Sequence, residues 1–107
     1  MKMITAIVQD KDVNQLSDKF VKARIQATRL HSTGGFLRSG NTTFMIGVED
    51  DQVDTVLEVI KTTAQTRKQI MTPAVNLDMT FDASMPVEVQ VGGATVFIQD
   101  VSAFYRF

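Results

Sequence analysis

The spacing of hydrophobic residues along the chain predicts strands that alternate with helices. Residues 2–9 are apolar or β-branched almost without a break, which is typical of a strand with two apolar faces. Apolar positions at helical spacing then predict a helix over about 12–24. Further strands are expected at 26–33 and 41–48. The cleanest i, i+3, i+4, i+7 pattern follows these strands and predicts a second helix that ends near Ala64.

Polar residues and glycines mark the expected element boundaries. Asp12 followed by Gln15 resembles a capping box at the start of the first helix, with a carboxylate in place of the hydroxyl. Residues 65–85 carry scattered polar groups and a proline, and they predict a long loop, which in a compact domain is usually functional or partly disordered. Apolar and polar residues alternate before the pair Gly92-Gly93, and a second apolar strand follows it, so residues 86–98 predict a β-hairpin.

The resulting order, β-α-β-β-α-loop-β-β, predicts an α+β, ferredoxin-like (split βαβ) fold in one domain over residues 1–107. In this fold an antiparallel sheet carries two helices on one face, here with a C-terminal β-hairpin strand in addition. The strands at 2–9 and 41–48 present apolar side chains to both faces, yet the helices cover only one. An uncovered apolar face is normally buried against a partner, so we predict a homo-oligomer.

The amino-acid composition excludes several classes of function for this protein. Apolar residues make up 44% of the chain and charged residues 21%, which is the balance of a folded globular protein. The formal net charge of −1 gives no general attraction for DNA or RNA. The chain has no cysteine and one histidine, which excludes disulfides, thiolate metal sites and a histidine-rich metal cage. Without a membrane-length apolar run or a secretory signal, we expect a cytoplasmic protein that makes no membrane contact.

The order of charges and a glycine-rich turn raise a candidate ligand site. Residues 19–48 contain lysines and arginines but no acidic residue. This is either a solvated basic face or a surface for a small anionic ligand. The turn over 33–43 contains Gly34, Gly35 and Gly40, which let a ligand approach peptide N–H groups. It is not a Walker A loop, because Asn41 replaces the lysine and a strand follows. An ordinary glycine hairpin remains the alternative.

No catalytic constellation is evident. His31 has no acidic neighbour in sequence, which favours a surface or interface histidine over a catalytic one. Phe36 is exposed by its position in the turn, and it either stacks on a base or packs in an oligomer interface. We therefore predict a protein that is not an enzyme, with no catalytic residues, no metal ligands and no cofactor.

Several segments carry a resemblance to a known family: residues 1–10, 33–44, 47–51 and 87–97. They resemble the PII-like cyclic di-AMP receptors of Gram-positive bacteria, and the similarity runs over essentially the whole chain. The resemblance implies a homotrimer with cyclic di-AMP in each cleft between neighbouring subunits. It also implies a signal-transduction protein without known catalytic activity, whose long loop follows the second helix.

The resemblance also implies ligand-binding residues. Thr28 looks like a phosphate contact, and the turn backbone resembles the phosphate and ribose cradle. Asn41 and Gly47 resemble the adenine-reading residues, and the turn at Gly92 is expected to contribute from the adjacent subunit. A side-chain amide suits the N6/N7 edge of adenine. The full expected set is Gln26, Ala27, Thr28, Gly35, Phe36, Leu37, Asn41, Gly47 and Gly92.

Two departures from the family pattern bear on the ligand. The family usually carries arginine at the position of Gln26, and glutamine keeps a hydrogen bond but loses the charge. The tail ends with Arg106-Phe107, which offers a cation where the family has a glutamine.

Three functional hypotheses follow. The first is a trimeric cyclic di-AMP sensor whose 65–85 loop changes order on binding and contacts an unknown downstream protein. The second is a PII-like trimer that binds another adenine nucleotide, or a ligand-free interaction module. The third, a ferredoxin-like isomerase or monooxygenase, is disfavoured because no His/Asp/Glu constellation lies on the expected strands.

Overall fold

The structure is a computed structural model that describes residues 1–31, 40–71 and 87–107. The elements follow the predicted alternation, with short strands where a loop was expected. In chain order they are β1 (Lys2–Gln9), α1 (Asp10–Lys22), β2 (Thr28–His31), β3 (Asn41–Val48), a 3-10 turn η1 (Asp50–Gln52), α2 (Val53–Ala64), β4 (Arg67–Met71), β5 (Val87–Val91) and β6 (Ala94–Asp100).

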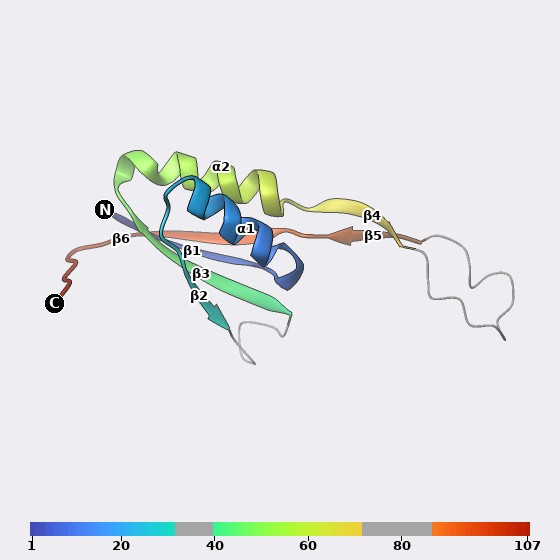
Figure 1. Ribbon diagram of the computed structural model, residues 1–107, viewed down its shortest axis with the longest axis horizontal. Helices are drawn as coiled ribbons and strands as arrows, with labels where there is room; N and C mark the ends of the chain where they lie inside the picture. The colour runs from blue at the N-terminus through green and yellow to red at the C-terminus, as the bar shows by residue number, and fades with distance from the viewer. Residues whose placement is uncertain (32–39, 72–86) are drawn as a thin grey trace, which may run out of the picture.

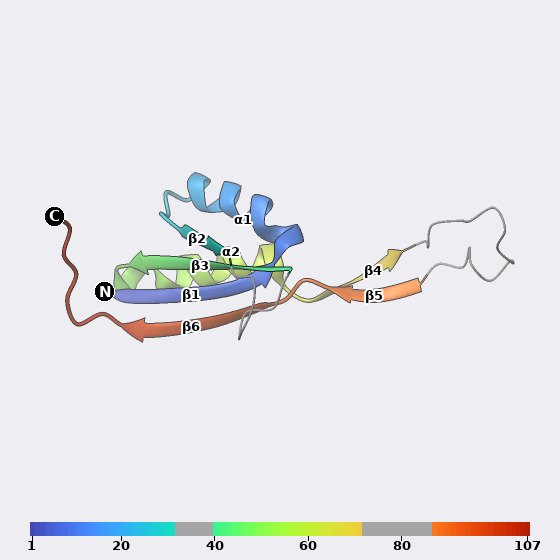
Figure 2. The ribbon, with the colours of Figure 1, turned by 90° about the horizontal axis from the view of Figure 1, so that it is seen from below.

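A four-stranded antiparallel sheet in the order β2-β3-β1-β6 forms the body, and α1 and α2 lie side by side on one of its faces (Figure 1). With β6 as the fourth strand, this arrangement is the predicted ferredoxin-like fold. Strands β4 and β5 form a separate two-stranded sheet, which we call the β4–β5 arm. The arm extends beyond the helices, at the end of the molecule opposite the two termini (Figures 1 and 2).

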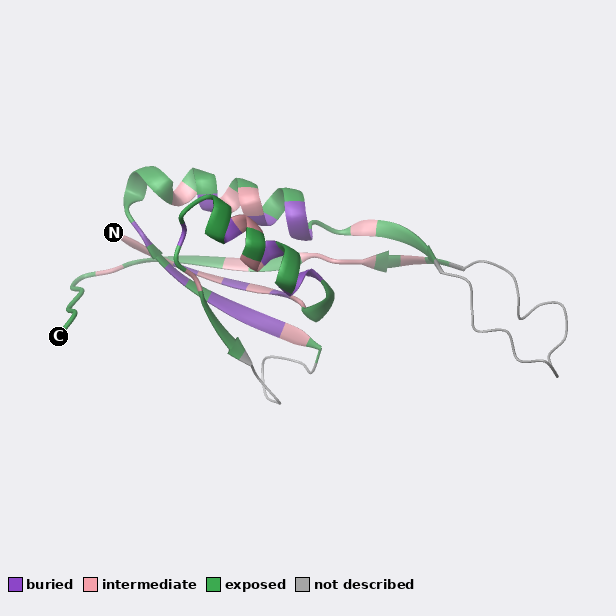
Figure 3. Ribbon diagram, in the orientation of Figure 1, coloured by how far each residue is buried: buried purple, intermediate pink, exposed green. Residues whose placement is uncertain are grey.

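The hydrophobic core lies between the sheet and the helices (Figure 3). Alternate residues of β1 are buried, as the period of a strand requires, and the helices contribute their apolar stripes. Phe20 of α1 packs edge-on against Phe44 of β3, with ring centroids 5.5 Å apart. The core residues are Ile4, Ala6, Val8, Val13, Leu16, Phe20, Ile25, Phe44, Ile46, Val48, Val56, Ile60 and Ala64.

In the described part of the chain, no helix lies on the opposite face of the sheet (Figure 1). The register places Thr28 opposite Met45, Met45 opposite Thr5, and Thr5 opposite Phe97, all on this open face. Leu30, also on this face, is 42% exposed and Phe97 is 47% exposed. The predicted uncovered apolar face is therefore present in the single chain.

The expected loop over 65–85 and the expected hairpin over 86–98 need correction. Arg67–Met71 is strand β4, which pairs antiparallel with β5; residues 72–86 lie outside the described residues. β5 and β6 do not form a hairpin, because β5 pairs with β4 whereas β6 pairs with β1. Between them Gly92 and Gly93 adopt φ of 82° and 100°, which directs the chain from one sheet to the other.

The expected capping box is also wrong. Helix α1 begins at Asp10, and its N-cap residue Gln9 makes no side-chain capping bond. Asp12 is instead buried, with 2% of its side chain exposed, and its Oδ1 lies 2.6 Å from an Arg67 guanidinium nitrogen. The carboxylate is needed for this contact with the arm, which sequence spacing does not reveal.

The remaining element boundaries differ by a few residues. β2 begins at Thr28 rather than at residue 26, and residues 32–39, which contain the expected end of this strand and most of the glycine-rich turn, lie outside the described residues. Among the described helices, none has the length and apolar character needed to cross a membrane.

Candidate functional site

Two hollows lie on the open face of the sheet, at opposite ends of β3. We call the first the tail hollow, because the C-terminal segment forms one of its sides. It has a volume of about 460 Å³. Its lining residues come from the N-terminus and β1, the start of β2 and the segment before it, β3, and the tail: Met1, Met3, Gln26, Thr28, Met45, Gly47, Val101, Phe104 and Arg106.

The chemistry of the tail hollow suits a flat, anionic ligand. Methionine side chains offer a polarizable apolar surface, and Gln26 and Thr28 supply polar groups. The absence of a side chain at Gly47 keeps the hollow open. A Cβ at this position would lie 3.3 Å from the Cε of Met1, and a larger side chain would fill the space. Among the residues that line this hollow, Arg106 is the one cationic side chain and none is acidic. The hollow therefore has a local positive charge in a chain whose net charge is −1.

Arg106 is positioned by an aromatic neighbour. Its guanidinium carbon lies 5.8 Å from the centroid of the Phe104 ring, within the range of a cation–π contact. Nearby, Lys2 and Asp100 form an ion pair that ties the ends of β1 and β6. Their hydrogen bond raises the pKa of Lys2 and lowers the pKa of Asp100, so both groups stay charged near neutral pH.

We call the second hollow the arm hollow, because the base of the β4–β5 arm closes one side. Its volume is about 340 Å³. Gln9 and Asn41 face each other across β1 and β3 in register, so two carboxamides meet at this end of the open face. The lining residues are Ile7, Val8, Gln9, Asn41, Thr66, Gly92, Gly93, Ala94 and Thr95.

Contacts from the end of β1 and the first turn of α1 to the base of the arm fix the shape of the arm hollow. The Gly92 N–H donates to Gln9 Oε1 at 2.7 Å, and Arg67 holds the buried Asp12 carboxylate. A Cβ on Gly92 would lie 2.4 Å from Arg67 Nη1 and 2.7 Å from the Gln65 carbonyl oxygen. Glycine is therefore required at position 92 by the close approach of Arg67 and Gln65, in addition to its positive φ.

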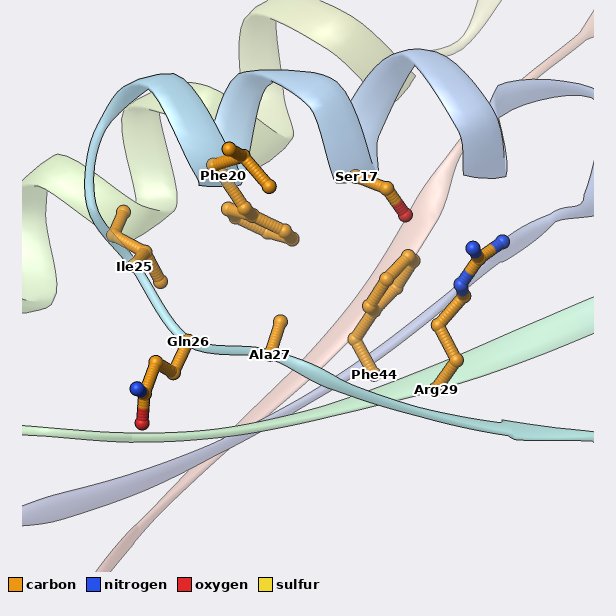
Figure 4. Close-up of a pocket in the computed structure, with 8 residues that line it drawn as sticks. Ser17, Phe20, Ile25, Gln26, Ala27, Arg29 and Phe44 are labelled. Carbon is orange, nitrogen blue, oxygen red and sulfur yellow. The ribbon is translucent and has the colours of Figure 1, made fainter.

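A third depression lies between α1 and the edge strand β2 and measures about 380 Å³ (Figure 4). Figure 4 shows Phe20, Ile25 and Phe44 on its apolar side, with Arg29 at one end and Gln26 at the other. Ala27 lines this depression rather than either hollow on the open face.

The structure brings together some of the residues expected at the site and separates others. Gln26, Thr28 and Gly47 line the tail hollow, whereas Asn41 and Gly92 line the arm hollow. Asn41 and Gly47 are six positions apart on β3, about 20 Å at ~3.3 Å per residue. The expected residues Gly35, Phe36 and Leu37 lie outside the described residues.

Sequence reasoning missed several lining residues. Gln9 ends a predicted strand, and Met45 and Phe104 carry no local signal; only the strand register and the path of the tail bring them to the hollows. Asn41 and Gly92 meet within a single chain, so they need no second subunit to become neighbours. In the part of the chain that the structure describes, no group of three or more His, Cys, Asp or Glu side chains could hold a metal ion.

The chain has a ferredoxin-like fold, and the open face of its sheet carries two hollows of the size that small ligands occupy. The sequence matches the cyclic-di-AMP receptor family over residues 1–107, and the chain therefore belongs to that family. A crystal structure described as a functionally unknown protein from Pediococcus pentosaceus ATCC 25745 is 52% identical. The match covers 99% of this chain and 96% of that one, with a TM-score of 0.82. The family resemblance and the fold expected from the sequence are thus confirmed.

Proposed function

We propose that this chain is a non-enzymatic cytoplasmic receptor that binds cyclic di-AMP at the subunit interfaces of a homotrimer. It relays the level of this dinucleotide to a partner protein through the 65–85 segment. Membership of the cyclic-di-AMP receptor family supports the ligand and the receptor role. We propose in addition that the protein is a trimer, that the residues named below contact the ligand, and that the 65–85 segment relays the signal.

The observation that carries the proposal is the tail hollow, where Gln26, Thr28 and Gly47 meet beside Arg106 without an acidic neighbour in the lining. Cyclic di-AMP carries two phosphate charges and two flat purines. A guanidinium suits its phosphates, and the methionine surface suits a base. Asn41 in the arm hollow suits the N6/N7 edge of an adenine, because one amide both donates and accepts.

The separation of the two hollows supports a site shared between subunits. Both hollows lie on the open sheet face, which also exposes Leu30 and Phe97. A second copy packed on this face buries these apolar side chains and encloses ligand at either end of β3. We propose that each dinucleotide contacts one end from one subunit and a different segment from its neighbour.

Calorimetric titration of the whole protein with cyclic di-AMP, cyclic di-GMP and ATP tests the proposal. We expect micromolar or tighter binding of cyclic di-AMP alone. Asn41→Ala is expected to weaken that binding by about 1–3 kcal/mol, because it strands base donors or acceptors. Asn14→Ala, the same substitution on the exposed surface of α1, is the matched control and leaves the affinity unchanged.

A second candidate function is an oligomer that binds another adenine nucleotide, or an interaction module without a ligand. Gln26 favours it, since this position is neutral where the family usually carries arginine. Tight binding of ATP in the same titration selects the first form of this candidate. The absence of heat with all three nucleotides selects the second form and removes the cyclic di-AMP receptor.

A further inference from the structure

The arm hollow contains a second carboxamide that the expected site did not include. Gln9, the last residue of β1, is the direct register partner of Asn41, the first residue of β3. Directly opposed residues of antiparallel strands place their Cβ atoms about 4.5–5.5 Å apart. Both residues line the arm hollow. A planar base that is read by Asn41 therefore lies within reach of Gln9.

The orientation of the Gln9 amide is set by the protein. Its Oε1 accepts the Gly92 N–H at 2.7 Å, and this bond fixes the side chain with both N–H donors of Nε2 open to a ligand. Among the described residues, this amine has no hydrogen-bond partner. A carboxamide whose oxygen is held in this way presents its NH2 group to a ligand, and this group recognises a hydrogen-bond acceptor.

We infer that Gln9 is a ligand-contacting and specificity-determining residue whose Nε2 donates to a ring nitrogen of the adenine that Asn41 reads. This inference rests on the proposed function, because it assumes an adenine in the arm hollow. Adenine presents ring-nitrogen acceptors on more than one edge, so one amide can take its N6/N7 edge while the other donates elsewhere on the ring. Two amides on neighbouring strands then discriminate adenine from a base with a different donor and acceptor pattern.

The test uses substitutions that separate the two hydrogen bonds of Gln9. Gln9→Glu keeps an oxygen that accepts the Gly92 N–H but removes the donor to the ligand. Gln9→Met removes both. Gln15→Glu introduces the same charge on the exposed surface of α1 and is the matched control. Cyclic di-AMP affinity is measured by calorimetry, and folding by the denaturant midpoint of each variant at one protein concentration.

We expect Gln9→Glu to weaken cyclic di-AMP binding about tenfold or more while its denaturant midpoint matches the wild type. Gln9→Met should weaken binding and also lower the midpoint, because the Gly92 N–H loses its acceptor. Gln15→Glu should change neither. Wild-type affinity in both Gln9 variants overturns the role of Gln9 but leaves the receptor function standing. If the wild type itself does not bind cyclic di-AMP, the proposed function fails, and the role of Gln9 fails with it.

Discussion

The strictest test of the described packing is the replacement of Gly92 by alanine. Gly92 has a φ of 82°, and a Cβ there would lie 2.4 Å from Arg67 Nη1 and 2.7 Å from the Gln65 carbonyl oxygen. Gly40 offers a matched comparison. Its φ is 91°, but a Cβ at this position meets none of the described atoms within 4 Å. The two substitutions share the backbone cost and differ only in the contacts of the new methyl group.

The magnitudes follow from these contacts. An L-residue in the left-handed region costs about 1–2 kcal/mol, which is the whole cost we expect for Gly40→Ala. In Gly92→Ala the methyl group also displaces Arg67 from Asp12, whose side chain is only 2% exposed. Loss of a partner from a buried ion pair costs about 3–5 kcal/mol. Arg67 has a flexible side chain that is 38% exposed, so it keeps part of the contact. We therefore expect Gly92→Ala to cost ~2–3 kcal/mol more than Gly40→Ala.

Urea unfolding at one fixed protein concentration measures these costs, since the proposed assembly would make the apparent stability depend on concentration. Repeating Gly92→Ala in an Asp12→Asn background completes a double-mutant cycle. There the extra cost should shrink, because the charge that Arg67 pairs with is already absent. Equal losses for the two glycine variants would refute the requirement for glycine at 92 by close contacts. An unchanged extra cost in the Asp12→Asn background would show that the Gln65 carbonyl, and not the displacement of Arg67 from Asp12, carries that cost.

Two further predictions concern assembly and ligand charge. Phe97→Glu places a charge on the open sheet face and is expected to dissociate the oligomer in sedimentation velocity experiments, whereas Val21→Glu, on the exposed surface of α1, leaves it intact. A stable oligomer in the Phe97 variant would contradict assembly through this face. Arg106→Gln removes the cation from the tail hollow and is expected to weaken cyclic di-AMP binding about tenfold, with a smaller loss at high salt. If Arg106→Gln binds cyclic di-AMP as tightly as the wild type at both low and high salt, Arg106 lies outside the site.

The body of the fold was predictable because local patterns and tertiary packing agree there. Continuous apolar residues in β1 and β3 indicated strands with two apolar faces, and helical periodicity located α1 and α2. The open face followed from the same pattern, since two helices cover one side only. The family resemblance added the ligand and named candidate residues, which periodicity cannot supply.

The arm was not predictable from local patterns. Strand β4 is short and mostly polar, and it is a strand because it pairs with β5, from which residues 72–86 separate it in the sequence. The alternation in β5 is equally compatible with pairing to β6, so the sequence pattern cannot choose between the partners. Asp12 was taken for a cap for a related reason: its buried contact with Arg67 joins residues 55 positions apart.

The geometry of the open face links ligand binding to assembly. The arm and tail hollows lie on the same face of the sheet as Met45 and Phe97, so a copy that covers these side chains also closes over the hollows. In the proposed assembly, a dinucleotide held between two copies would stabilise the assembled state through its own binding free energy, because separated chains would offer only part of its contacts. The Gln9–Gly92 hydrogen bond joins the arm hollow directly to the base of the β4–β5 arm. If the arm hollow holds the ligand, this bond provides a physical connection between its occupancy and the position of the arm, which is the coupling that the proposed relay to a partner protein requires.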